Sequence, residues 1–218
     1  MRLFVFGASG GTGAQVVAQA LDAGHRVTAL ARDPSSVSAS VPASVPGRDR
    51  LTVVRGDVLE PGGWAGAVAG HDAVLSCLGS AGRGPTTVYS RGMDGIVGAM
   101  RDGGVRRLLC VTSASLGLAA GASLSRRVLI GWVVRPVYRH LYADMARMEG
   151  IVAGSGLDWT VVRPPRLSDG GFSGEYRVVS GREVGRNRSL SRADLAHFML
   201  GRVNDRDTWG ATVELSRS

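Results

Sequence analysis

The sequence predicts an α/β fold of the doubly wound type, in which a mainly parallel sheet carries helices on both faces. Two observations indicate this fold. Short runs that are apolar on both faces alternate along the chain with helical stretches, a pattern typical of a parallel sheet covered on two sides. A glycine-rich stretch, FGASGGTGAQVV at 6–17, follows the first apolar run and leads into the first helix. The 218 residues suffice for one well-buried core, so we expect a single domain over 1–218.

The first half of the chain contains three of the expected strands. They are the apolar runs LFVF (3–6), RVTALA (26–31) and LTVV (51–54). A helix from Ala14 to Ala23 separates the first two, and Gly24 is expected to end it, because glycine readily adopts the conformation that closes a helix. Residues 34–50 are rich in Ser, Pro and Ala and are expected to form a surface loop, variable near 38–50.

The second half of the chain continues this alternation. Strands are expected at 72–79, 106–114 and 157–164, with helices from Thr86 to Arg101 and from Val137 to Ala153 between them. Residues 115–136 have no clean period and are expected to form a second variable loop. A small C-terminal extension, 166–218, is expected to hold a hairpin strand at 176–179, a helix starting at Ser191 and a last strand near 211–215.

Composition and charge narrow the function classes. The chain contains 26 arginines and no lysine. These arginines are spread along the chain and are not interleaved with aromatic residues, so no nucleic-acid partner is expected despite the net charge of +8. The apolar runs are too short for a membrane span and no signal peptide is visible, so we expect a cytoplasmic protein. Cys77 and Cys110 fall inside expected strands and indicate reduced core thiols, and the four dispersed histidines predict no metal site.

The glycine-rich stretch has the spacing G-x-x-G-x-x-G, formed by Gly7, Gly10 and Gly13. Gly7 permits the tight turn out of the strand, Gly10 lets the backbone approach a pyrophosphate, and Gly13 lets the helix pack closely on the sheet. The first N–H groups and the positive end of the helix would then face the phosphates. Between a strand and an aliphatic helix, this spacing predicts a dinucleotide site.

The end of the second strand indicates which dinucleotide binds. An NAD site usually places a carboxylate there for the ribose 2′-hydroxyl, whereas this strand ends in Arg32 followed by Asp33. A guanidinium matches a 2′-phosphate, to which Ser35 or Ser36 could add a hydroxyl, so NADP(H) is favoured over NAD(H). The alternative is that Arg32 is a solvated charge and Asp33 binds the ribose.

Several segments together resemble the atypical, NAD(P)H-binding branch of the short-chain dehydrogenase/reductase superfamily, and most closely its biliverdin-IXβ reductase/flavin reductase members. The segments are FGASGGTG, ALARDPSS, VVRGDVLE, GHDAVLSCLG, GPTTVYSRG, LLCVTSA, SGLDWTVVRPPRL and LSRADLAHFML. This resemblance implies a Rossmann-type fold, the use of NADPH, and hydride transfer to flavins, tetrapyrroles or other planar acceptors.

The resemblance also implies roles for individual residues. Those matched to cofactor contacts are Ser9, Gly10, Gly11 and Thr12 in the phosphate loop, Arg32 at the 2′-phosphate, Asp57 and Val58 beside the adenine, and Ser113, Pro164 and Pro165 around the nicotinamide. Cys77, Leu78 and Gly79, which follow the fourth strand, are also expected to flank the cofactor. The chain departs from the reductase at Arg166, where the reductase has a histidine, and at Ser36, where it has a second arginine.

The absence of lysine excludes the Tyr-x-x-x-Lys pair with which many short-chain dehydrogenases reduce carbonyls. The remaining candidates for catalysis are Ser113, Arg166 and Tyr142, although Tyr142 and the nearby Tyr138 also suit a packing role. Arg166 either attracts an anionic acceptor or pairs with Asp169. A flavin or quinone has less need of a protein acid, because it accepts hydride at a ring atom and can collect its proton from water.

These observations favour an NADPH-dependent reductase with a small-molecule hydride acceptor, flavin included, acting as a monomer or homodimer. A different class remains open, an NmrA-like regulator that senses NADP(H) without turnover. A third possibility is a biosynthetic reductase or isomerase whose substrate supplies its own acid.

Overall fold

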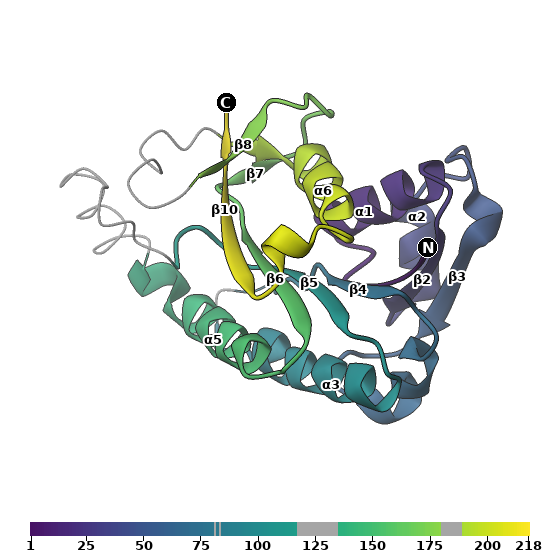
Figure 1. Cartoon of the computed structure of the whole chain (residues 1–218), viewed down its shortest axis with the longest axis horizontal. Coiled ribbons are helices and arrows are strands. Elements are labelled where there is room, and N and C mark those ends of the chain that lie inside the picture. Colours follow the sequence, from purple (N-terminus) through teal and green to yellow (C-terminus); the bar gives the residue numbers. More distant parts are fainter. Residues whose placement is uncertain (81, 83, 117–134, 180–188) are drawn as a thin grey trace.

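The computed structural model describes residues 1–80, 82, 84–116, 135–179 and 189–218, and these contain an eight-stranded sheet of order β3-β2-β1-β4-β5-β6-β10-β8 (Figure 1). Neighbouring strands are parallel except for β8, which runs antiparallel to β10. The strands are β1 (Arg2–Phe6), β2 (Arg26–Ala31), β3 (Leu51–Arg55), β4 (Ala73–Ser76), β5 (Arg107–Val111), β6 (Asp158–Arg163), β8 (Tyr176–Val179) and β10 (Ala211–Arg217).

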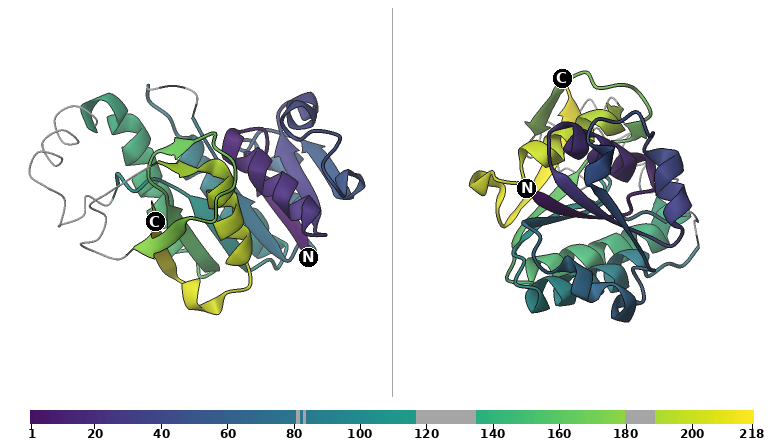
Figure 2. Two further views of the ribbon diagram at one scale, coloured as in Figure 1. Left: turned by 90° about the horizontal axis from the view of Figure 1, so that it is seen from above. Right: turned by 90° about the vertical axis from the view of Figure 1, so that its right-hand side faces the viewer.

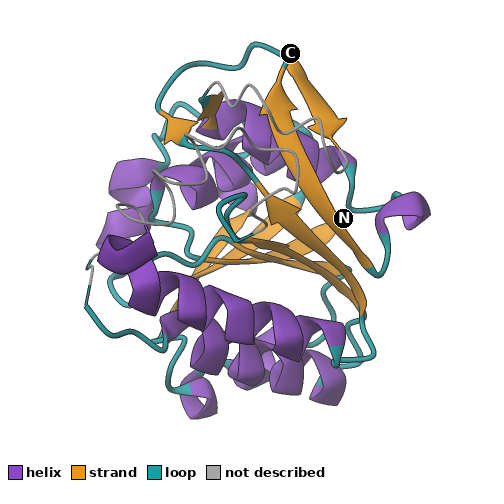
Figure 3. Cartoon of the chain, turned by 90° about the vertical axis from the view of Figure 1, so that its left-hand side faces the viewer, coloured by secondary structure: helices purple, strands orange, loops and turns teal. Residues whose placement is uncertain are grey.

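Helices cover both faces of this sheet (Figures 1 and 3). The α-helices are α1 (Gly11–Asp22), α2 (Pro34–Ser40), α3 (Val88–Asp102), α5 (Arg135–Ala153) and α6 (Arg192–Gly201). Short 3-10 turns lie at η1 (Arg48–Arg50), η2 (Pro61–Gly63), η3 (Ala65–Val68) and η6 (Arg206–Thr208). Helices α1 and α6 pack together on one face, and α3 and α5 on the other, as Figure 2 also shows. The predicted doubly wound α/β fold is therefore confirmed.

The strands are apolar on both faces because each face has its own core. On β1, Leu3 and Val5 belong to the core under α1 and α6, whereas Phe4 and Phe6 belong to the core under α3 and α5. Side chains alternate between the two faces of a strand, so a central strand in this fold must be apolar at every position.

Two local expectations are wrong. Residues 34–50 are not loop throughout, because Asp33 caps α2 by accepting a hydrogen bond from the Ser35 N–H (2.9 Å) and Pro34 occupies its first turn. The strand at 176–179 forms as expected, but it is no hairpin strand, since its partner is β10. The expected loop at 115–136 falls mostly on 117–134, outside the described residues.

The residues after 166, expected as a small extension, contribute to the main sheet and its cover. They supply β8, β10 and α6, together with a short parallel pair of β7 (Leu167–Ser168) and β9 (Leu190–Ser191) that no sequence pattern predicted. Among the described residues, no helix has both the length and the apolar character required to cross a membrane.

Candidate nucleotide-binding site

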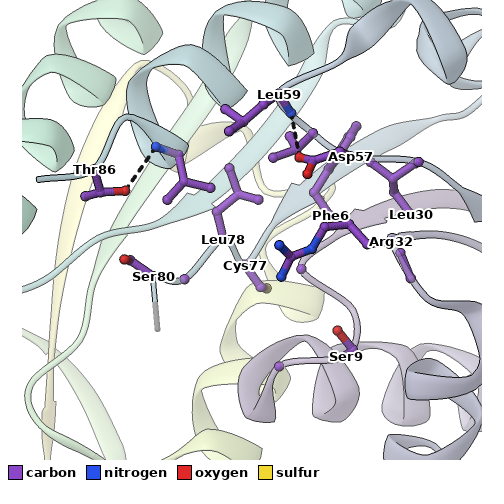
Figure 4. Close-up of a pocket in the computed structure, with 17 residues that line it drawn as sticks. Phe6, Ser9, Leu30, Arg32, Asp57, Leu59, Cys77, Leu78, Ser80 and Thr86 are labelled. Atoms are coloured by element: carbon purple, nitrogen blue, oxygen red, sulfur yellow. Dashed lines mark hydrogen bonds between the residues drawn. The ribbon is translucent and has the colours of Figure 1, made fainter. Parts of the chain in front are cut away.

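A cavity of about 540 Å³ lies at the carboxyl ends of β1, β2 and β4 (Figure 4). Strands β2 and β4 flank β1 on opposite sides, so the strand order reverses here, which is where doubly wound sheets bind ligands. The predicted cofactor residues that line it are Gly7, Ser9, Gly10, Arg32, Asp57, Val58, Cys77, Leu78 and Gly79. The other lining residues are Phe6, Leu30, Ala31, Gly56, Leu59, Ser80, Thr86 and Val88.

The glycines at both ends of the phosphate loop are required by close backbone contacts. Gly7 has φ +73°, and a Cβ there would lie 2.3 Å from the carbonyl oxygen of Cys77 in the neighbouring chain segment. A Cβ on Gly13 would lie 2.1 Å from the carbonyl oxygen of Gly7. Side chains at these positions would displace the loop, so the loop follows β1 and enters α1 by a path that only glycine permits.

The N-terminus of α1 opens toward the cavity without a side chain to cap it. Its N-cap is Gly10, no side chain accepts a hydrogen bond from its first turn, and no acidic residue stands there. The first turn holds Gly11, Thr12 and Gly13, which do not line the cavity themselves. Uncapped N–H groups and the positive end of the helix dipole make this terminus suited to an anion such as a phosphate.

Arg32 and Asp33 have different roles at the end of β2. Arg32 is exposed and lines the cavity, with its guanidinium turned into it (Figure 4). Both carboxylate oxygens of Asp33 accept hydrogen bonds from Ser35, one from its N–H (2.9 Å) and one from its hydroxyl (2.7 Å). The hydrogen bonds from Ser35 hold the pKa of Asp33 below its ordinary value. Asp33 is thus an ionised helix cap.

Two further parts of the lining, the segments after β3 and after β4, are fixed by hydrogen bonds within each segment or to the start of α3. The Asp57 carboxylate accepts from the Leu59 N–H (3.0 Å), and its carbonyl accepts from the Trp64 indole (2.7 Å), while Val58 is buried beside them. In the segment after β4, the Ser80 N–H donates to the Tyr89 hydroxyl (3.1 Å). These contacts position the residues that line the cavity.

A buried carboxylate connects the start of α3, beside the cavity, to α5. Asp144, fully buried on α5, accepts from the Tyr89 N–H (2.9 Å) and from the Ser90 hydroxyl in the first turn of α3. Arg147 is its ion-pair partner (3.2 Å). The carboxylate therefore ties the beginning of α3, next to the cavity, to the helix beside it.

Ser113, Pro164 and Pro165 lie together at the ends of β5 and β6 but do not line the cavity of 540 Å³. The Ala114 N–H donates to the Pro164 carbonyl (2.9 Å), which joins the two segments. The half-buried Ser113 accepts at its hydroxyl from the Ser115 N–H (3.3 Å), so this side chain supports the turn after β5.

A charged network lies behind these strand ends. Glu149 on α5 accepts from the Thr112 hydroxyl (2.8 Å) and pairs with Arg163 (2.5 Å), which also faces Glu214 (3.5 Å). Because the half-buried Arg163 donates to Glu149, the pKa of the arginine is raised above its ordinary value. The network fixes the ends of β5 and β6 and the middle of β10 relative to α5.

The other catalytic candidates lie apart from the cavity. Tyr142 packs against the core under α3 and α5, with its ring 6.1 Å from that of Tyr138. Arg166 is exposed, and its carbonyl accepts from the Leu190 N–H (3.0 Å). The pairing of Arg166 with Asp169 left open above is not found, since Asp169 pairs with Arg192 (2.5 Å).

Arg192 is a candidate site residue that sequence reasoning missed. A Cβ on Gly11 would lie 2.7 Å from its Cδ and 2.8 Å from its Nε, so the arginine side chain rests on the first turn of α1. This contact depends on the packing of α6 against α1. In the sequence, the feature that points to Arg192 is its position directly after Ser191, the residue that caps α6.

The cysteines do not provide a reactive or metal-binding group in the described part of the chain. Cys77 and Cys110 are buried and free, and burial raises the pKa of the Cys77 thiol to about 12, which keeps it protonated at neutral pH. No group of three or more His, Cys, Asp and Glu side chains suited to a metal occurs among the described residues.

The chain is similar to proteins of one family over most of its length. Residues 7–206 match the sequence pattern of a family described as NAD(P)H-binding. An uncharacterized chloroplastic protein of Arabidopsis thaliana is 29% identical over 180 residues. That match covers 77% of this chain but only 60% of the relative, so the chain spans less than two thirds of the relative's length.

Solved structures share the fold at low sequence identity. The oxidoreductase ylbE from Lactococcus lactis matches with a TM-score of 0.80 at 19% identity, covering 100% of this chain and 91% of its own. ChuY, an anaerobillin reductase from Escherichia coli O157:H7, matches with a TM-score of 0.74 at 22% sequence identity, and the match covers 100% of this chain and 97% of ChuY. A short-chain dehydrogenase/reductase from Veillonella parvula in complex with NADP matches with a TM-score of 0.78 at 17% sequence identity, and the match covers 99% of this chain and 94% of that protein.

Proposed function

Since the chain belongs to the NAD(P)H-binding family, we propose that it is an NADPH-dependent reductase that transfers hydride to a small planar acceptor. The observation that carries this proposal is the cavity at the reversal of strand order, which joins the uncapped N-terminus of α1 to the guanidinium of Arg32. Gly7 and Gly13 leave a loop that lacks side chains against the helix end, which fits a pyrophosphate.

The preference for NADPH over NADH rests on the contrast between Arg32 and Asp33. A site selective for NADH needs a carboxylate free to accept from the ribose hydroxyls. Asp33 accepts from Ser35 at both oxygens and does not line the cavity, whereas Arg32 lines it and has no ion-pair partner among the described residues. Its guanidinium is therefore the group that would bind a 2′-phosphate.

The proposed reaction does not require a protein side chain that donates a proton. NADPH would supply the hydride, and an acceptor such as a flavin, quinone or tetrapyrrole-like compound can take its proton from water. The chain's own residues bind and orient: Ser113 and Pro164 would border the reacting groups, and the exposed Arg166 would attract an anionic acceptor. Orientation of two reactants can supply about 7–11 kcal/mol of a barrier, so residues that only bind and orient can accelerate the transfer while water supplies the proton.

The proposal is tested by mixing the protein with NADPH and, in turn, FMN, riboflavin, quinones and biliverdin, while the absorbance of the reduced nicotinamide is followed. We expect steady oxidation of NADPH with at least one acceptor. Biliverdin belongs in the panel because one of the similar structures is an anaerobillin reductase. Tight NADPH binding without oxidation by any acceptor would contradict the reductase and favour the NADP(H)-sensing regulator.

A further inference from the structure

A second cavity lies at the opposite end of the strands that form the nucleotide-binding site. It has a volume of about 240 Å³ and is found at the amino ends of β1 and β2 and beside β3. Its charged and polar lining residues are Arg2, Arg26, Arg50, Thr28, Thr52 and His71, together with Asp49. The cavity of 540 Å³ begins at the other ends of these strands, so the two cavities are separate.

Three arginines meet in this small volume. Arg2 and Arg26 are direct register partners on β1 and β2, so their side chains leave the sheet next to each other, and Arg50 comes directly before β3. None of the three forms an ion pair with a described acidic residue. Like charges side by side on paired strands repel, so an anion bound between them would relieve this repulsion.

Arg50 adds a donor that lacks a partner. Its Nη2 donates to the Leu21 carbonyl (2.6 Å), which fixes the guanidinium in place. Its Nε is buried and has no hydrogen-bond partner in the described part of the chain. Buried donors are normally satisfied, so this Nε is an exception within a residue that lines the cavity.

Hydroxyl and imidazole groups complete the lining. Thr28 and Thr52 are register partners on β2 and β3. The His71 Nδ1 donates to the Val68 carbonyl (3.0 Å), and its Nε2 lies 2.8 Å from the Thr28 hydroxyl. The ring also stands edge-on to Phe4, with 5.2 Å between centroids. These contacts hold the imidazole and hydroxyl rigidly beside the arginines.

Carboxylates only partly balance the positive charge. Asp49 is the one acidic residue in the lining, and Asp72, just before β4, uses one carboxylate oxygen to accept from the Arg2 backbone N–H (2.6 Å). Three arginines therefore line the cavity together with a single acidic residue. Such a site favours an anion that carries two negative charges and has an oxygen able to donate a hydrogen bond to Asp49.

We propose that this cavity is a binding site for a phosphate group, carried by inorganic phosphate or by a small phosphate monoester. Arginine forks and the Thr52 hydroxyl match phosphate oxygens, and the hydroxyl of a monoprotonated phosphate or of the ester matches Asp49. The volume is below the roughly 300–1,000 Å³ typical of sites for drug-sized ligands, which suits a group smaller than a nucleotide. The site is independent of the cofactor and goes beyond the proposed reductase function.

The thermal unfolding midpoint, measured against inorganic phosphate and against chloride at equal ionic strength, tests this site. We expect a saturable rise of the midpoint with phosphate that persists in an Arg32→Gln variant. Arg26→Gln, at an exposed position, should weaken the apparent phosphate affinity at least tenfold. Arg91→Gln, which removes an exposed arginine on α3, is the matched control and should leave the affinity unchanged.

Glycerol phosphate in place of inorganic phosphate distinguishes the two sources of the phosphate group. Tighter binding of glycerol phosphate supports an ester as ligand, and tighter binding of inorganic phosphate supports the free ion. The proposal is overturned if phosphate acts no differently from chloride, if Arg26→Gln and Arg91→Gln behave alike, or if Arg32→Gln abolishes the effect. None of these outcomes depends on oxidation of NADPH. The phosphate measurements can therefore be interpreted even if the reductase proposal fails.

Discussion

At the scale of single residues, Arg32 and Asp33 have different roles, and the sequence alone could not show which of them would contact a nucleotide. Arg32 and Asp33 both stand at the end of β2, where either one suits a ribose or its phosphate. Two hydrogen bonds from Ser35 commit Asp33 to the start of α2 and leave Arg32 to the cavity. A helix of seven residues thus decides which charge is available to a ligand.

Replacing Arg32 by Ala should weaken NADPH binding by about 2 kcal/mol, roughly 30-fold, because charge-assisted hydrogen bonds to a phosphate are lost. NADH lacks this phosphate, so its affinity should change little. Titration calorimetry with both nucleotides measures the two effects. Arg55→Ala, at an exposed position at the end of β3, is the control; equal losses for NADPH and NADH in Arg32→Ala would refute the assigned role.

Gly13→Ala should impair both folding and nucleotide binding, since its Cβ would overlap the Gly7 carbonyl oxygen at 2.1 Å. We expect a destabilisation of about 1–3 kcal/mol, typical of overpacking, measured by urea unfolding. Gly98→Ala makes the same chemical change inside α3, where nothing lies within 4 Å, and should stabilise by about 0.5–1 kcal/mol. Unaltered NADPH affinity in Gly13→Ala would show that the loop tolerates a side chain.

At the scale of elements, the start of α6 is held by a carboxylate that collects donors from two segments. Asp194, which is 2% exposed, accepts from Ser191 at the helix start and from the N–H groups of Ser173 (2.8 Å) and Gly174 (2.9 Å). Burial raises the pKa of Asp194, but the hydrogen bonds from Ser191, Ser173 and Gly174 outweigh burial, so the net pKa is below its ordinary value.

This lowered pKa makes the contribution of Asp194 to stability dependent on acid. A carboxyl group whose pKa is lower in the folded state stabilises the fold above its unfolded pKa of about 4, and the stabilisation is lost as the pH falls through the folded pKa. Asp194→Asn should therefore cost about 2 kcal/mol at pH 7 and should remove part of the fall in stability below pH ~4. Urea unfolding of both proteins from pH 3 to 7 would show parallel curves if the carboxylate has no such role.

Element boundaries were predictable where one local signal decides them. Gly24 was expected to end the first helix and does have φ +85° directly after the C-cap Ala23. Helix α2 was missed because a Ser- and Pro-rich composition is typical of loops, although Asp33 and Pro34 are ordinary helix-start residues. The partner of β8 could not be read from the sequence, because strand pairing depends on the whole sheet.

At the scale of the whole molecule, the sequence predicted the fold class and about half of the residues that line the cavity, since those residues follow strands and parallel strands end at one edge. It did not predict the contact of Arg192 with Gly11, which arises from the packing of α6 on α1, far away in sequence. The second cavity was missed for the same reason: Arg2, Arg26 and Arg50 are ordinary surface arginines until the strand register brings them together.

The position of β10 between β6 and β8 has a consequence for folding kinetics. Strand β6 pairs with β5 on one edge and with Ala211–Arg217 on the other, and both pairings join residues 51 positions apart in the sequence. Pairings between distant segments form slowly, because loop closure must precede the contacts that stabilise it. Refolding intermediates in which β10 has not yet paired should therefore expose the unpaired backbone N–H and C=O groups of β6, and association through that edge would compete with completion of the sheet as the protein concentration rises.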